Sequence, residues 1–161
     1  MPSTMPPEVI DILSKIHQRK VILFIGNGAS IESGAPKTKD LVDIIKKTFS
    51  KAEYKGDDFI QTCTDVLETS ITSKSELEGL IKKKLYGLKP SNFHLELPLH
   101  SWPAIFTTNY DDLIEQGYRN VDHRIQNVEP IFSDQDQITL NDTEKVKLFK
   151  LMGCIVSQTR Y

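Results

Sequence analysis

The chain has 161 residues, of which 39% are hydrophobic and 26% are charged, and this composition is typical of one soluble globular domain with its own core. Lysine and arginine number 20 against 22 acidic residues, so the formal net charge of −2 does not indicate nucleic acid as a partner. The two cysteines, Cys63 and Cys154, lack the spacing of a zinc site and predict a reducing compartment. No apolar run approaches the roughly 18 residues of a membrane span, and the N-terminal residues show no leader pattern. We therefore expect a cytoplasmic protein.

The first predicted elements alternate between helix and strand. Apolar residues at helical spacing predict a short helix over 9–16, which leads into a strand at 21–25. After a turn at 33–36, a second amphipathic helix is expected, with Thr38 or Asp40 as its N-cap. A strand followed by a helix in this way is the repeating unit of parallel α/β folds.

The middle of the chain is predicted to be mainly helical. A small helical insertion of two helices is expected over about 57–88, divided by the polar run "ETSITSKSE". A further short helix is expected to begin near Ser91 or Asn92 and to end by Trp102. The run "AIFTT", residues 104–108, has the composition of a compact strand.

The last predicted elements are a helix over 111–117 and a buried strand over 146–151. Trp102 and Phe93 are expected to be core or staple residues. Strands separated by helices favour an α/β fold of the Rossmann-like kind, an open parallel sheet flanked by helices, in which ligands bind beyond the carboxyl ends of the strands. Three short tips, "GNGAS", "TTNYD" and "KLMG", each follow a predicted strand directly. We expect these tips to converge on one crevice.

The first tip, taken alone, has two interpretations. Gly26 and Gly28 flank Asn27 and would let backbone amides approach a pyrophosphate closely. The third position of the usual dinucleotide fingerprint, G-x-G-x-x-G/A, is however Ile31. The alternative is that the glycines only make a tight turn between a strand and a helix, and this tip by itself supports both interpretations equally.

The three tips together resemble the motifs of sirtuin-like domains. "GNGASIESGAP" resembles their G-A-G-x-S followed by S-G-x-P, "FTTNYDDLIE" resembles T-x-N-x-D, and "KLMG" stands in the place of K/E-L-H-G, in the same order over 21–153. The "TTNYDDLIE" run looks like the bacterial antiphage-defence branch. The resemblance implies one NAD-binding domain over 1–161 that acts as an NAD+ glycohydrolase, releasing nicotinamide and ADP-ribose. The alternative is a noncatalytic module that binds NAD or ADP-ribose or serves assembly.

The resemblance also assigns residues to the ligand and to the reaction. Asn109 would stand beside the nicotinamide ribose and orient a water molecule and a sugar hydroxyl. Asp111 would fix that loop or face the positive charge that develops as the glycosidic bond breaks, although it could equally cap the helix that it begins. No metal is implied. The predicted cofactor-binding residues are Gly26, Asn27, Gly28, Ala29, Ser30, Pro36, Thr108 and Asn109.

Met152 departs from the family pattern, because it stands where the family carries a histidine that serves as a base. Methionine cannot accept a proton at physiological pH, so we expect slow NAD cleavage or none. The alternative is that Met152 is a gap-filling core residue. His94, His100 and His123 are candidate replacement bases, but none follows a strand at a recognised motif, and structural or solvent-facing roles are expected for them. The chain also lacks paired C-x-x-C motifs, which argues against protein deacylation.

Sirtuin-like domains continue beyond the third motif with further strands and helices, whereas this sequence stops at "CIVSQTRY". The expectation is therefore a domain truncated at its C-terminus, either a piece of a longer protein with a sensor domain or a reduced domain completed by a partner or by a second copy in a homo-oligomer.

Overall fold

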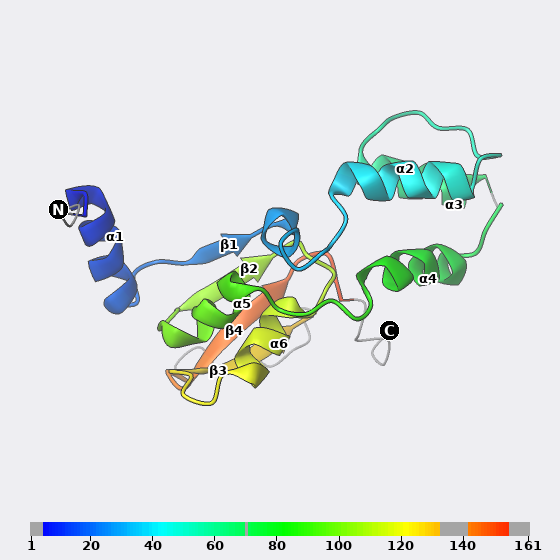
Figure 1. Cartoon of the computed structure of the whole chain (residues 1–161). Helices are drawn as coiled ribbons and strands as arrows, with labels where there is room; N and C mark the ends of the chain where they lie inside the picture. Colours follow the sequence, from blue (N-terminus) through cyan, green and yellow to red (C-terminus); the bar gives the residue numbers. More distant parts are fainter. Residues whose placement is uncertain (1–4, 70, 133–141, 155–161) are drawn as a thin grey trace. The chain divides into compact units, whose positions relative to one another are not determined.

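The structure is a computed structural model that describes residues 5–69, 71–132 and 142–154, so the "IVSQTRY" end of the sequence lies outside the described residues. The chain divides into two compact units, which are described separately: Met1–Ala29 together with Lys89–Tyr161, and Ser30–Leu88 (Figure 1). No helix within the described ranges is long and apolar enough to cross a membrane.

The first unit contains a four-stranded parallel sheet with the order β1-β2-β4-β3. This arrangement confirms the predicted α/β class. The strand before β4 was not predicted, because "NVEPI" contains a proline and lies between polar runs. The first strand is shorter than the predicted 21–25, and the last begins and ends one residue earlier than predicted. The strands are β1 Leu23–Ile25, β2 Ala104–Thr107, β3 Asn127–Ile131 and β4 Lys145–Lys150.

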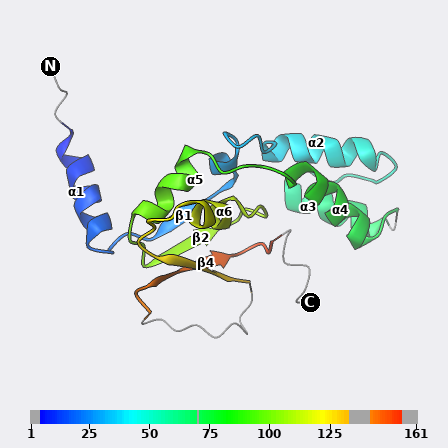
Figure 2. The same cartoon turned by 60° about the horizontal axis from the view of Figure 1, so that its bottom comes forward.

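Short helices cover one face of this sheet (Figure 2). They are α5 Asn92–Glu96, the 3₁₀ turn η2 Leu97–Leu99 and α6 Leu113–Asn120. The helix α5 begins where predicted, because Ser91 is its N-cap and the Ser91 amide donates to Nδ1 of His94 at 3.2 Å. The N-terminal helix α1, Pro7–His17, contains no buried residue.

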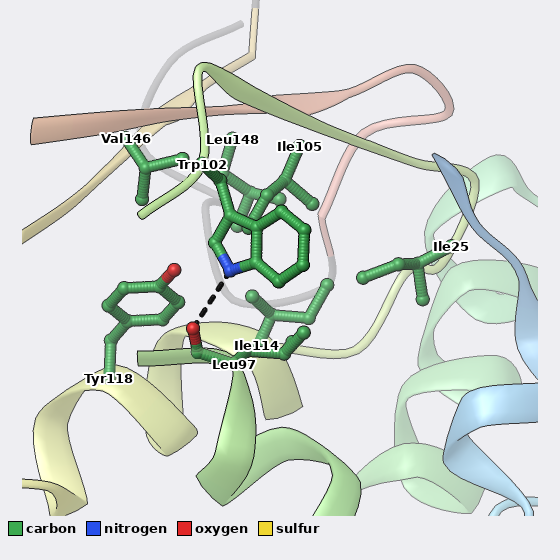
Figure 3. Packing of buried hydrophobic residues seen from close by; sticks show 8 residues of the cluster. All are labelled: Ile25, Leu97, Trp102, Ile105, Ile114, Tyr118, Val146 and Leu148. Atoms are coloured by element: carbon green, nitrogen blue, oxygen red, sulfur yellow. Dashed lines mark hydrogen bonds between the residues drawn. The ribbon is translucent and has the colours of Figure 1, made fainter. Parts of the chain in front are cut away.

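The core of the first unit lies between the sheet and these helices (Figure 3). The Trp102 indole is 4% exposed, and its Nε1 donates to the carbonyl of Leu97 at 2.9 Å, so its one polar atom is satisfied inside an apolar cluster. The core position predicted for Trp102 is confirmed, whereas Phe93 is 41% exposed and is not a core residue. The cluster consists of Ile25, Leu97, Trp102, Ile105, Ile114, Tyr118, Val146 and Leu148.

The second unit is helical and has a core of its own, formed by Ile45, Ala52, Val66 and Leu77. Its helices are α2 Thr38–Thr48, α3 Phe59–Glu68 and α4 Lys74–Leu85. The last two are the helices predicted for the insertion. Asp58 is the N-cap of α3 and Ser73 is the N-cap of α4. Each side chain accepts a hydrogen bond from a backbone amide in the first turn of its helix.

The predicted N-cap of α2 is wrong. The N-cap position is occupied by Lys37, and Thr38 is already the first helical residue. Asp40 contributes from inside the first turn instead, because its carboxylate accepts a hydrogen bond from the Lys37 amide at 3.1 Å. A carboxylate in this position also interacts favourably with the positive, N-terminal end of the helix dipole.

Candidate functional site

The carboxyl ends of β1, β2 and β4 lie side by side in the first unit. Ile25 is paired with Thr107, and Thr107 with Lys150, so the three predicted tips begin at the same edge of the sheet. The hydrogen bonding continues beyond the strands: the Thr108 amide donates to Ile25 O at 3.2 Å, and the Leu151 amide donates to Thr107 O at 2.9 Å. The three tips therefore begin at one edge of the sheet, and the crevice expected there stays a prediction.

The side chain of Thr107 shapes the loop that follows β2. Its hydroxyl donates to the carbonyl of Ile25 at 3.0 Å and accepts from the backbone amide of Asn109 at 3.0 Å. Thr107 is fully buried and Asn109 is 4% exposed. A buried hydroxyl that serves as both donor and acceptor thus ties the Asn109 loop to the end of β1.

Asp111 lies at the other end of the same loop, just before α6. One of its carboxylate oxygens accepts from the Leu113 amide at 3.2 Å, and the residue is 4% exposed. The helix itself begins at Leu113, two residues later than predicted, because Asp111 and Asp112 are used in the turn before it. The N-cap of α6 is Asp112, so Asp111 is not the N-cap, although its carboxylate accepts from the first amide of the helix. The catalytic role of Asp111 stays a prediction.

A buried ion pair beneath this loop was not predicted from the sequence. Lys150 Nζ lies 3.1 Å from Glu115 Oε1 and also donates to the backbone carbonyl of Asp111. Burial raises the pKa of the Glu115 carboxyl, and the nearby Lys150 ammonium opposes that shift in pKa. The signals in the sequence were a lysine inside the apolar run "VKLFKL" and a glutamate on the apolar side of "DDLIE".

The glycines of the first tip are exposed and are not required by the path of the chain. Positive φ angles occur at Gly34, Gly87 and Gly153, but at neither Gly26 nor Gly28. A Cβ added at Gly28 would have no described heavy atom within 4 Å, and one at Gly26 would meet only Thr108 Oγ1, at 3.9 Å. Neither backbone strain nor crowding explains these glycines. At Gly26 the nearest described atom belongs to Thr108, in the loop that carries Asn109.

Not every amide of the first tip is available to a ligand. The Ala29 amide donates to the Gly26 carbonyl at 3.1 Å and closes the turn. Ser30 is fully buried, and its own carbonyl accepts from the amides of Ser33 and Ala35, both at 3.1 Å. Ser30 and Pro36 belong to the second unit, and the ligand contacts predicted for these two residues stay predictions.

Met152 lies in the turn after β4, one residue beyond Leu151, and is 39% exposed, so the alternative that it fills the core is wrong. The turn that contains Met152 is closed by the Gly153 amide, which donates to Lys150 O at 3.2 Å. Among the histidines, His94 is fully buried within α5, His100 lies edge-on against the Trp102 ring, and His123 is exposed. The structural and solvent-facing roles expected for them agree with these positions.

The polar groups at this edge of the sheet come from the residues that follow β1 and β2. In the part of the chain that the structure describes, no three side chains of His, Cys, Asp or Glu are grouped so that they could hold a metal ion. The site instead offers exposed glycine backbone, a buried amide side chain on Asn109 and the polar loop between Thr107 and Asp111. Backbone amides and an amide side chain can hydrogen-bond to phosphate and sugar oxygens.

Comparison with known protein families gives one match. Residues 103–161 match the family model described as a SIR2-like domain. The match spans less than half of the chain, and it contains the second and third tips, the strands β2, β3 and β4, and the helix α6. The glycine tip lies outside it. No curated protein matches the chain.

Proposed function

We propose, from the premise that this chain carries a sirtuin-like domain, that it binds NAD at the carboxyl edge of its sheet and acts as an NAD+ glycohydrolase that releases nicotinamide and ADP-ribose. The proposed activity would serve antiviral defence in the cytoplasm, where destruction of NAD would halt phage replication. NAD supplies the glycosidic bond that is cleaved. The residues of this chain bind it, orient it and stabilise the charge that develops.

One observation carries the proposal: two exposed glycines without backbone strain adjoin a loop that is buried and tied down. Thr108 N donates to Ile25 O at 3.2 Å, so the loop that carries Asn109 lies beside the residue that precedes Gly26. Open space at Gly28 supports close approach of a diphosphate, and the fixed loop supports precise orientation of the ribose. A nucleotide-free structural domain would not need both features at one edge.

Each residue in the proposal has a separate task. The amides of Gly26 and Gly28 hold the diphosphate. Asn109 orients a water molecule and a ribose hydroxyl, and Asp111 supplies negative charge near the bond that breaks. Because Met152 cannot accept a proton, cleavage by the chain as written is slow, while NAD binding is retained.

Assembly belongs to the same proposal. The helix α1 has four exposed apolar side chains within two turns, Val9, Ile10, Ile12 and Leu13, and such a surface supports a homo-oligomer or a partner or sensor domain. Light scattering coupled to size exclusion measures the mass of the particle. A monomer at all tested concentrations would remove the homo-oligomer from the proposal without affecting NAD binding.

The experiment that tests NAD binding compares two glycine variants. Gly28→Val places a branched side chain in the space proposed for the diphosphate, so NAD affinity measured by calorimetry should fall at least about tenfold. Gly79→Val is the matched control, because Gly79 lies in α4, also has no described heavy atom near its Cβ position and belongs to the other unit. Unchanged NAD affinity in a folded Gly28→Val protein would reject the site.

A second experiment separates the enzyme from the noncatalytic alternative. Nicotinamide release is followed by chromatography after the protein is mixed with NAD. Asn109→Ala should lower the rate of release far more than it lowers NAD affinity, since a residue that orients the reacting water acts mainly in the transition state. Asn120→Ala, at the exposed end of α6, is the control. NAD binding with no release from the wild type or from Met152→His would favour a binding or assembly module.

A further inference from the structure

The ammonium group of Lys150 is deeply buried at the edge of the sheet where the proposed site lies. Its side chain is 1% exposed, and the Glu115 side chain that it meets is 6% exposed. Removing a lysine from water is costly unless its charge and its donors are matched inside the protein. Lys150 therefore has to be explained by the groups that it contacts.

One of those groups is the loop that carries Asn109. Lys150 Nζ donates to the backbone carbonyl of Asp111. It also lies 3.1 Å from Oε1 of Glu115, which is in the first turn of α6. The loop is thus held at both ends: Thr107 ties its start to β1, and Lys150 ties its end to β4. Asn109 lies between the two anchors.

We propose that Lys150 is a positioning residue, which fixes the Thr107–Asp111 loop, and Asn109 within it, by donating to the Asp111 carbonyl while Glu115 balances its charge. The role of the buried Lys150 ammonium is its hydrogen bond to the loop, and Glu115 is the counter-ion of Lys150. Lys150 does not touch the ligand. The consequence for NAD chemistry rests on the proposed function, whereas the consequence for the loop does not.

The first test is made on the wild-type protein and needs no variant. A lysine ammonium held by a carbonyl and a carboxylate exchanges its protons slowly with water, and its NMR signal is observable, with a coupling across the hydrogen bond to the Asp111 carbonyl carbon. A protected Lys150 ammonium signal with this coupling supports the proposal. A Lys150 ammonium that exchanges as fast as those of exposed lysines overturns it.

The second test removes the charge of Lys150 together with that of its counter-ion. In Lys150→Met/Glu115→Leu, two side chains of similar size replace the ion pair, so the core stays filled and no buried charge is stranded. Hydrogen exchange at the Asn109 and Leu113 amides should become at least about tenfold faster, because a hydrogen bond from a charged donor is worth that factor or more. Exchange in the centres of β2 and β4 should not change.

The control removes another buried lysine from the same strand. Lys147 is 5% exposed and pairs with Glu129 of β3, and neither residue contacts the Asn109 loop in an interaction recorded by the structure. Lys147→Met/Glu129→Leu should therefore leave the Asn109 and Leu113 amides as protected as in the wild type. Equal effects of the two double variants, or none from the Lys150 variant, would make Lys150 a structural residue only and overturn the proposal.

The functional consequence is measured separately. If the wild type releases nicotinamide, the Lys150 double variant should lower kcat and leave KM nearly unchanged, since orientation of Asn109 counts mainly in the transition state. A loss of NAD affinity with kcat unchanged would contradict this assignment. If the wild type releases no nicotinamide, the proposed activity fails, and the ammonium signal and hydrogen exchange still decide the role of Lys150.

Discussion

The hydroxyl of Thr107 donates to the carbonyl of Ile25 at 3.0 Å, across the ends of two neighbouring parallel strands. The same hydroxyl accepts from the Asn109 amide, so one side chain links the end of β1 to the loop after β2. The glycine tip begins at the residue after Ile25. This contact therefore links the start of the glycine tip to the Asn109 loop within the first unit.

Thr107→Val should weaken this link with little change in shape. Valine matches threonine in size but cannot donate or accept, which leaves the Ile25 carbonyl and the Asn109 amide without the buried hydroxyl. We expect the free energy of unfolding, from urea titration, to fall by about 1–3 kcal/mol. Thr143→Val is the control, since Thr143 is exposed and should change stability by less than about 0.5 kcal/mol. A variant as stable as the wild type would show that this bond is unimportant.

Gly117→Ala should destabilise the contact between α5 and α6. A Cβ at Gly117 would lie 2.2 Å from the backbone oxygen of His94, and a backbone atom cannot move aside as the end of a side chain can. The thermal midpoint should fall, with a loss of about 1–3 kcal/mol. Gly79→Ala is the matched change, because its Cβ would meet no described atom and helix propensity alone should make it stabilising by up to about 1 kcal/mol. Similar midpoints for the two variants would contradict this account.

Glu115 should make the stability of the protein fall as the pH rises. Burial raises the pKa of its carboxyl above the ordinary 4.5, with Asp112 acting in the same direction and Lys150 acting against it. The folded state then binds the proton more tightly than the unfolded state, so this contribution is fully present below about pH 4.5 and is lost as the pH rises through the higher folded pKa.

To test this, the free energy of unfolding is measured by urea titration for the wild type and for Glu115→Gln at several pH values from about 4 to about 8. The advantage of the wild type over the variant should shrink as the pH rises. Asp112→Asn should alter this trend less, because Asp112 is a smaller influence on the pKa of Glu115 than burial is. An advantage that grows with pH would mean that attraction to Lys150 outweighs burial.

Met152→His should increase nicotinamide release with little change in NAD affinity. The side chain at this position is 39% exposed, so an imidazole can be accommodated without burial, and a positioned base contributes roughly 10²- to 10⁴-fold to proton transfer. Leu151→His is the control, because Leu151 is also exposed, at 52%, and this substitution places the same imidazole one residue earlier in the chain. Release that rises equally in both variants, or in neither, would argue against a lost base at position 152.

The sequence alone determined the fold class, most of the helices and the residues that follow each of the three predicted strands. Periodicity places Leu41, Val42 and Ile45 on one side of a helix, and glycine or polar tips after apolar runs mark strand ends, because these signals depend on neighbours within a few residues. Parallel pairing then brings strand ends to one edge in any fold of this kind. The convergence of the three tips could therefore be predicted, as could the core position of Trp102.

The contacts that connect those tips were decided only by the tertiary structure. Nothing near Lys150 in the sequence indicates that it meets Glu115, 35 residues away, or the carbonyl of Asp111. The weak strand β3, with Pro130 inside it, is likewise held by pairing with β4 rather than by its own propensity. Burial and long-range pairing set which polar groups face each other and how far their pKa values shift. These properties depend on the packed molecule, because a side chain's environment is made by residues far away in the chain.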